Sequence, residues 1–161
     1  MLGTRICDPH RTESSQKETN GLGMLKMETV FGRDKVLSQV KAKEASSGLD
    51  VSGYEIHHGR SRNTGKHSPA FNIIERKGKA VRDTDGIIAM DDRLFGTYIH
   101  GIFDANAFRR DLLNRIRAKK CWAPLVNKAS FDPDHELDKL AGLVRKNIDM
   151  KCLYKIIKNG D

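Results

Sequence analysis

Gly96-Thr97-Tyr98-Ile99-His100-Gly101-Ile102-Phe103-Asp104 is the stretch around which the rest of the chain is organised. Strand-favouring residues lead to a histidine, and a glycine follows at once. A histidine at the end of a strand, freed by a neighbouring glycine, can act as a general acid or base, because its unperturbed pKa is about 6.5. His100 is therefore the first candidate catalytic residue, although a structural histidine satisfied by backbone partners fits the same pattern.

The segments around this stretch predict strands first and helices last. Alternating or strand-rich patterns predict strands at residues 35–43, 51–58, 71–76, 86–90 and 94–100. We expect an irregularity near Ser38, a turn at residues 84–86 and a polar loop at residues 59–69. Residues 1–6 are typical of the end of a helix with Gly3 as its C-cap, and residues 21–25 of a buried turn that leads into a strand.

Apolar residues recur at helical spacing towards the end of the chain. The first stripe is Phe108, Leu112, Leu113 and Ile116, with Asp104 or Asn106 as the predicted cap. The second starts near Asp134 and holds Leu137, Leu140, Val144 and Ile148, and Leu153, Ile156 and Ile157 continue it. We interpret these stripes as core packing. Strands followed by helices suggest α+β, whereas an earlier run of alternating strands and helices would make the parent fold α/β.

Composition limits the classes of function. A chain of 161 residues is long enough for one domain with a core. Its formal net charge of +8 permits an anionic partner, but the basic residues are scattered without zinc-finger spacing or an RNA-module aromatic motif, so we expect no nucleic-acid partner. We also expect no membrane partner, because no apolar run approaches the roughly 20 residues of a membrane span. The three distant cysteines fit a reducing compartment, and we expect a cytoplasmic protein.

A second group of chemically active residues is Gly53-Tyr54-Glu55-Ile56-His57-His58-Gly59. In a strand, Glu55 and His57 share one face, while Tyr54 and His58 share the other. A carboxylate beside a histidine can orient it or raise its pKa. A zinc site is an alternative interpretation, with Glu55, His57, His58 and His100 as its ligands. The chain shows neither HxH nor HExxH spacing, however, and we expect no metal.

The two motifs above and several shorter ones form one ordered set along the chain. The ordered set is Asp8-Pro9, residues 21–25 (GLGML), residues 29–31 (TVF) with Lys35, residues 53–59, Asp85-Gly86, residues 96–104, Phe108-Arg109 and Leu112-Leu113. It closely resembles the C-terminal glutamine amidotransferase domain of the cobyric acid synthase family, in the cobalamin-biosynthesis branch of Cys-His amidotransferases. The sister cobyrinic acid a,c-diamide synthases share the domain but not usually the GYEIHxG form. The resemblance covers nearly the whole chain.

The resemblance implies an α/β fold, a class I glutamine amidotransferase-like (flavodoxin-like) domain with a mixed sheet and C-terminal helices. It implies that a cysteine attacks the carboxamide of glutamine, that His100 activates the thiol, and that His100 protonates the leaving ammonia. Ammonia then serves an N-terminal synthetase domain, which uses ATP and Mg²⁺ to amidate corrin side-chain carboxylates. We expect no cofactor on this chain itself. Glu55, Tyr54 and His57 are candidate orienting or substrate-side residues, and Glu55 is chosen on its chemistry alone.

The chain departs from the family's pattern in ways that affect this expectation. Met1-Leu2-Gly3 match the end of the family's Gly-x-Cys-Gly-Gly-x-Gln-Met-Leu-Gly segment, so the nucleophile is expected just upstream of Met1. Cys7 follows that segment and cannot replace the nucleophile by position, and Ile102 stands where related amidotransferases have an acid. Arg11 and Ser14 stand where glycine is common.

These departures set the expected activity of the chain. We expect residues 1–161 to form a partial amidotransferase domain without the synthetase domain, inactive alone. The alternative is a non-catalytic remnant or a subunit-binding module.

Overall fold

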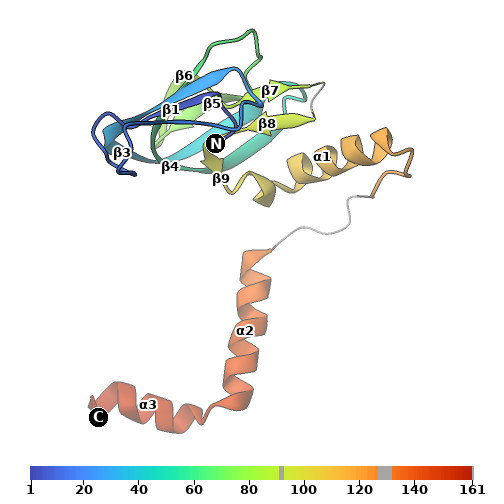
Figure 1. Cartoon of the computed structure of the whole chain (residues 1–161). Helices are drawn as coiled ribbons and strands as arrows, with labels where there is room; N and C mark the ends of the chain where they lie inside the picture. Colours follow the sequence, from blue (N-terminus) through green and yellow to red (C-terminus); the bar gives the residue numbers. More distant parts are fainter. Residues whose placement is uncertain (91–92, 127–131, 161) are drawn as a thin grey trace. The chain divides into compact units, whose positions relative to one another are not determined.

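The chain forms two units, residues 1–127 and residues 128–161, and each is described by itself (Figure 1). In this computed structural model, residues 1–90, 93–126 and 132–160 are described. The first unit holds β1 (Arg5–Cys7), β2 (Glu18–Asn20), β3 (Met27–Glu44), β4 (Asp50–Asn63), β5 (Phe71–Arg76), β6 (Lys79–Asp85), β7 (Ile87–Ala89), β8 (Leu94–Gly96), β9 (Ile99–His100), a 3₁₀ turn η1 (Ile102–Asp104) and α1 (Asn106–Lys119). The second unit holds α2 (Pro133–Asn147) and α3 (Met150–Asn159).

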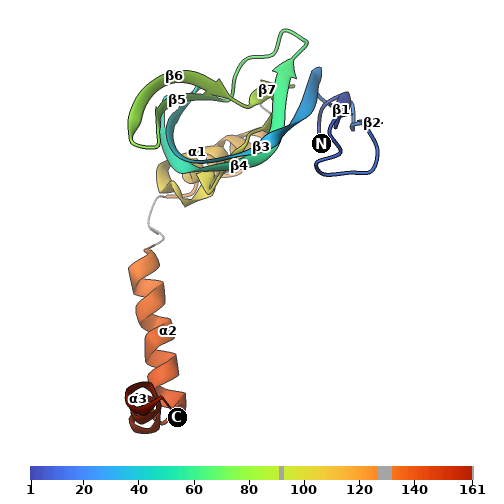
Figure 2. The same ribbon diagram turned by 90° about the vertical axis from the view of Figure 1, so that its left-hand side faces the viewer.

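The long strand β3 organises the main sheet of the first unit. It pairs antiparallel with β4 on both sides of a bulge, while β1 pairs parallel with its first half and β5 antiparallel with its second half. The path β2-β1-β3-β4-β9 continues the sheet to both sides, and β6 pairs with β5. Figure 2 shows β3 and β4 bending along their length. This mixed sheet with helices after it confirms the predicted α/β class and is consistent with a class I amidotransferase-like domain.

A bulge in β3 decides which side chains point inward. Between the pairs Phe31–Gly59 and Val36–His57, β3 advances five residues while β4 advances two. The excess of three residues is odd, so the inward positions change from odd numbers to even numbers. Thr29 is accordingly buried before the bulge, and Val40 and Ala42 after it. The predicted irregularity near Ser38 therefore lies earlier, at residues 31–36.

Several predicted strand limits change. β4 continues to Asn63, so the first part of the loop predicted at residues 59–69 is strand. β6 was not predicted, and it forms a hairpin with β5. The strand predicted at residues 94–100 is divided, because β8 pairs with β7 in a separate two-stranded sheet and β9 pairs with β4. Residues 1–6 contain no helix, and Arg5 to Cys7 form β1. The turn predicted to be buried at residues 21–25 is mostly exposed, with Leu22 70% and Met24 45% exposed, and only Leu25, 1% exposed, enters the core.

The core lies between the inner face of the sheet and α1. Its buried side chains are Val40, Ala42, Val51, Ala70, Phe71, Ile73, Ile99, Ile102 and Phe108. The Phe71 and Phe108 rings meet edge to face with centroids 5.7 Å apart, and Leu112 packs against the same core, so the first half of the predicted apolar stripe of α1 enters the core. Leu113 and Ile116, 40% and 50% exposed, do not. Arg115 of α1 also reaches the buried Glu44 carboxylate at 2.5 Å. Neither Asp104 nor Asn106 caps α1, because Ala105 is the N-cap and Asp104 lies in η1.

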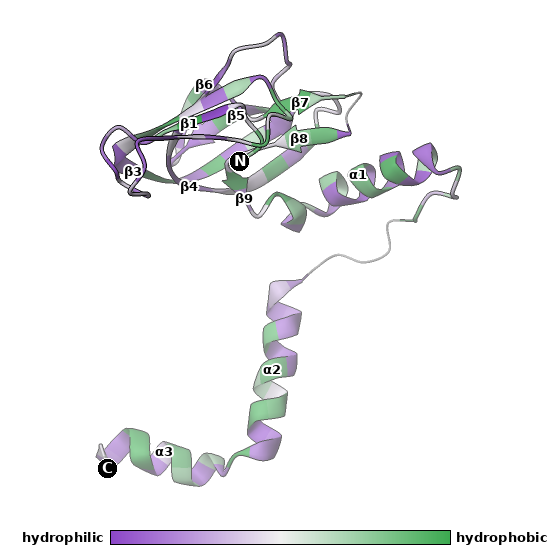
Figure 3. Ribbon diagram, in the orientation of Figure 1, coloured by the Kyte–Doolittle hydropathy of each residue, from purple (hydrophilic) through white to green (hydrophobic). Residues whose placement is uncertain are grey.

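The second unit consists of two capped helices with exposed apolar side chains. The Asp132 carboxylate accepts the backbone N–H of Asp134 and of His135, and the Asp149 carboxylate caps α3 in the same way. Within the described residues, the second predicted apolar stripe is therefore divided between two helices, α2 and α3. None of the residues in α2 and α3 is buried, so the core packing expected for their stripes is not seen within this unit. Figure 3 shows hydrophobic positions interspersed with hydrophilic ones along both helices. No helix among the described residues is long and apolar enough to cross a membrane.

Gly53 offers a test of how β9 is held against β4. A Cβ added at Gly53 would lie 1.9 Å from the His100 carbonyl oxygen, which is far inside van der Waals contact. We expect Gly53→Ala to lower the free energy of unfolding by about 2 kcal/mol, because β9 must move away from β4. Denaturant unfolding of the whole chain measures this change.

Gly32→Ala is the matched control, because Gly32 also lies in a long strand and its added Cβ would meet only ordinary contacts, the nearest at 3.7 Å. It should change the free energy of unfolding by less than about 1 kcal/mol. Equal effects of the two substitutions would contradict a close approach of β9 at Gly53.

Candidate functional site

His100 lies at the outer edge of the main sheet. It ends β9, which pairs only with β4 in the described sheet, and it stands directly opposite Tyr54. The imidazole stacks on the Tyr54 ring with centroids 5.1 Å apart and planes 9° apart. Gly101 follows with a φ of 80°, a conformation that glycine adopts without strain, and the chain turns into η1. The His100 side chain is therefore exposed, with one ring face held and with space for a partner.

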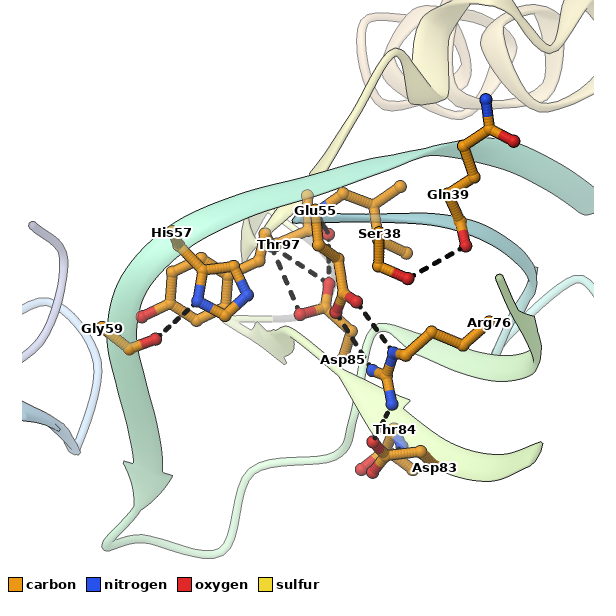
Figure 4. Close-up of polar contacts among 12 residues, drawn as sticks. Ser38, Gln39, Glu55, His57, Gly59, Arg76, Asp83, Thr84, Asp85 and Thr97 are labelled. Carbon is orange, nitrogen blue, oxygen red and sulfur yellow. Dashed lines mark hydrogen bonds and ion pairs between the residues drawn. The ribbon is translucent and has the colours of Figure 1, made fainter. Parts of the chain in front are cut away.

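Glu55 lies on the opposite face of β4 from His100. Paired residues of an antiparallel ladder share a face, and Glu55 pairs with Ile99 while Tyr54 pairs with His100. The Glu55 carboxylate, 4% exposed, binds the Arg76 guanidinium through two hydrogen bonds of 2.9 and 3.1 Å (Figure 4). The structure therefore brings Glu55 to Arg76 and does not bring it to His100.

Arg76 extends this ion pair to a second carboxylate. Its guanidinium donates to Asp83 at 2.9 Å as well as to Glu55. The hydrogen bond with Glu55 raises the pKa of Arg76, and burial works in the other direction. The hydrogen bond from Arg76 lowers the pKa of Asp83. Sequence reasoning missed Arg76, since a lone arginine at the end of a strand carries no local signal of a partner on another strand.

His57 is held on the same face as Glu55. Its Nδ1 lies 2.6 Å from the Gly59 carbonyl oxygen, so Nδ1 donates, because a carbonyl can only accept. Its ring stacks on Tyr98 at 4.0 Å, and its Nε2 is buried without a hydrogen-bond partner among the described residues. His58 points to the other face, where its Nε2 lies 3.8 Å from the Glu13 carboxylate. The described residues contain no group of three or more side chains placed to hold a metal.

Asp85 is a buried carboxyl that ties together the segments before His100. It is 6% exposed, and it accepts the Thr97 hydroxyl and the Tyr98 backbone N–H, the latter at 3.1 and 3.3 Å (Figure 4). Burial raises the pKa of Asp85, and the nearby Glu55 charge acts in the same direction. The sequence showed Asp85 as part of a turn and as one of the ordered motifs, without indicating its partners. A polar pair between apolar segments, Asp85 and Thr97, was the signal that could have identified it.

A cavity of about 720 Å³ opens on this inner face. Its lining includes Leu25, Glu55, His57, Asp85 and Thr97. Glu55 and His57 are thus brought together around one cavity, whereas Tyr54 and His100 lie together on the outer face. The four predicted site residues therefore form two groups, separated by the thickness of β4.

Cys7 is remote from His100. It lies in β1, and the sheet order β1-β3-β4-β9 places two strands between it and His100. With about 4.8 Å between neighbouring strands, the two backbones are about 14 Å apart across the sheet. A thiol at this position does not reach the His100 imidazole.

The pH dependence of stability tests the burial of Asp85. The pKa of Asp85 is raised in the folded chain, so the native state keeps this proton at pH values where the unfolded state has already lost it. Stability attributable to Asp85 therefore falls as the pH rises from the unfolded pKa, about 3.9, towards the folded value. We expect the stability deficit of Asp85→Asn relative to wild type to shrink over this range, as measured by urea unfolding.

Asp83→Asn is the control with the opposite sign. The pKa of Asp83 is lowered, so its contribution is lost as the pH falls through the folded pKa. The deficit of Asp83→Asn should therefore be larger at neutral pH than in acid, although modest because Asp83 is half exposed. If the stability deficits of the two variants changed with pH in the same direction, the raised pKa of Asp85 and the lowered pKa of Asp83 would be contradicted.

Comparisons with known proteins agree with the motif order. The model of the CobB/CobQ-like glutamine amidotransferase domain matches residues 1–108. Cobyric acid synthase of Clostridium tetani is 44% identical over 159 residues, covering 98% of this chain and 32% of the relative. Cobyric acid synthase of Caldanaerobacter subterraneus is 39% identical over 170 residues, covering 98% of this chain and 33% of the relative. That of Clostridium botulinum strain Loch Maree is 42% identical over 163 residues, covering 98% of this chain and 32% of the relative.

The chain spans about a third of the length of these curated relatives. The predicted resemblance is confirmed, because the family model covers more than half of the 161 residues and the relatives align along nearly all of them. The chain belongs to the CobB/CobQ-like glutamine amidotransferase domain family.

Proposed function

We propose that this chain supplies the histidine of a glutamine amidotransferase of the cobyric acid synthase type, and that His100 is the general base. One observation carries the proposal. His100 lies exposed at the sheet edge, stacked on Tyr54, with its ring free to meet a partner from outside the described sheet. A base for nucleophilic catalysis must reach both the nucleophile and the leaving group, and this position allows both.

The chemistry assigned to His100 is two proton transfers. The imidazole takes the proton of a thiol, and the thiolate sulfur attacks the carboxamide carbon of glutamine. The imidazolium then gives its proton to the nitrogen, the C–N bond breaks and ammonia leaves. A water molecule, deprotonated by the same imidazole, then attacks the thioester carbon, the C–S bond breaks to release glutamate, and the imidazolium returns its proton to the thiolate. Because Cys7 is remote, the proposal places the thiol outside residues 1–161, in sequence that precedes the match to Met1 in longer relatives.

Tyr54 and Glu55 take different parts in this proposal. Tyr54 restricts the imidazole of His100 by stacking and lines the substrate side, since it is 46% exposed beside it. Glu55 acts on the inner face, where its pair with Arg76 supports β4 rather than orienting the imidazole directly. His57 supports the same face through Tyr98. No third member of a catalytic triad is assigned among the described residues.

The substrate of this chain is glutamine, and the product handed on is ammonia. We further propose that, in a longer protein, ammonia serves the ATP-dependent amidation of corrin carboxylates, as the names of the relatives suggest. ATP and Mg²⁺ would then be bound outside residues 1–161, since the chain has no GxxxxGK[ST] motif. Such a protein would work in the cytoplasm, without nucleic-acid or membrane partners.

Ammonia release from glutamine tests the proposal. We expect none from this chain alone. A fusion of the Clostridium tetani relative's preceding sequence to residues 1–161 should restore it, because a thiol then reaches His100. His100→Gln in the fusion should lower the rate by about 10³-fold, the usual contribution of a general base.

His10→Gln is the control, because His10 is an exposed loop residue and should leave the rate unchanged. An active fusion that tolerates His100→Gln would reject His100 as the base. A folded fusion that binds glutamine without turnover would instead support the alternative, a non-catalytic binding module. The exposed apolar side chains on the outer face of the sheet, Leu37 at 61% and Val30 at 46%, are what favour that alternative.

A further inference from the structure

We propose that Asp85 is a positioning residue for His100, acting through Thr97 and the backbone of Tyr98. The inference rests on the proposed function, because it gives His100 a role whose geometry matters. Asp85 has no contact with the imidazole itself in the structure. Its effect is transmitted through Thr97 and Tyr98, the two residues between β8 and β9, to Ile99.

The segment before His100 needs an anchor, because β9 is only two residues long. β8 pairs with β7 in the small sheet, and β9 pairs with β4 in the main sheet, so Thr97 and Tyr98 cross from one sheet to the other. Two paired residues provide few hydrogen bonds to hold a strand. The position of His100 therefore depends on what fixes residues 97 and 98.

Asp85 stands at the junction of the two sheets. It is the last residue of β6, which belongs to the main sheet, and Gly86 then turns the chain into β7 of the small sheet. Its carboxyl accepts both the Thr97 hydroxyl and the Tyr98 N–H, so one buried group holds both crossing residues. Hydrogen bonds to a buried acceptor are costly to lose, because the donors cannot turn to water.

Thr97 passes this constraint on to β9. Its Oγ1 donates to Asp85 and accepts the Ile99 backbone N–H at 3.0 Å. Ile99 is 3% exposed in the core, and side chains alternate along a strand, so fixing Ile99 inward directs His100 outward. The close approach at Gly53 and the stacking on Tyr54 then complete the placement of the imidazole.

Magnetic resonance of the His100 ring in the whole chain tests the proposal, with His100→Gln used to assign the ring signals. We expect Asp85→Ala and Thr97→Val each to shift those signals, because the imidazole loosens on Tyr54. Each should also speed hydrogen exchange of the Ile99 amide by about tenfold, because its hydroxyl acceptor is lost or released. Thr97→Ser keeps the hydroxyl and should keep both readouts near wild type.

Thr84→Val is the matched control. Thr84 precedes Asp85 in β6, its side chain is exposed, and its backbone N–H donates to Asp83 at 2.8 Å. Thr84→Val should change neither the His100 ring signals nor the hydrogen exchange of the Ile99 amide. Exchange of the Val40 amide in β3 is the internal reference, since a general loss of stability would speed Val40 and Ile99 alike, whereas a positioning role speeds Ile99 more.

The proposal would be overturned if Thr97→Val changed neither the His100 ring signals nor the exchange of the Ile99 amide. It would also be overturned if Thr97→Val accelerated exchange of the Val40 and Ile99 amides equally. If Asp85→Ala does not fold, the comparison of Thr97→Val with Thr97→Ser decides the question. Neither readout needs glutamine, so the outcomes separate. If His100→Gln inactivates the fusion but Thr97→Val leaves the His100 ring signals unchanged, only the positioning role is rejected. If Thr97→Val shifts the ring signals but the His100→Gln fusion stays active, only the proposed function is rejected.

Discussion

The antiparallel pairing of β3 with β4 is the constraint on which the rest of the first unit depends. β4 presents His57 and Glu55 inward and Tyr54 outward, and this division holds only in the observed register. The other edge of β3 carries β1 and β5, and the outer edge of β4 carries β9. Loss of this pairing would divide the main sheet in two, with β1, β2, β5 and β6 left on β3, and with β9 and His100 left on β4.

The two faces of β4 have different physical roles. The inner face satisfies buried charge, with Glu55 held by two hydrogen bonds from Arg76 and Asp85 by donors from the chain before His100. A buried carboxylate without such partners would be strongly destabilising, so these contacts tie together segments that are not paired with each other in the sheet, β4 with β5 and β6 with the residues before β9. The outer face offers a histidine and an aromatic ring to solvent. Rigidity on one face thus supports an accessible group on the other.

Local pattern predicted much of this from the sequence. The limits of β5 and the apolar face of α1 follow from periodicity, and the opposite orientation of Tyr54 and Glu55 follows from alternation. The ordered motifs predicted the family. What local pattern could not supply was long-range pairing. Arg76 lies 21 residues from Glu55, and Asp85 lies 12 residues from Thr97, so their contacts depend on the folded sheet. The polar, exposed sequence of β6 hid a strand that is held mainly by β5.

The bulge between Phe31 and Val36 has a consequence for how the chain tolerates changes in length. Residues inserted or deleted in this loop of β3 can be absorbed locally, since its residues already stand outside the ladder. The same change between Val36 and Glu44 would exchange the inner and outer rows, placing Lys41 in the core and Val40 in water. The first part of β3 can therefore vary in length independently of the second, and the bulge separates the segment of β3 that pairs with β1 from the segment that pairs with β5 on the same edge.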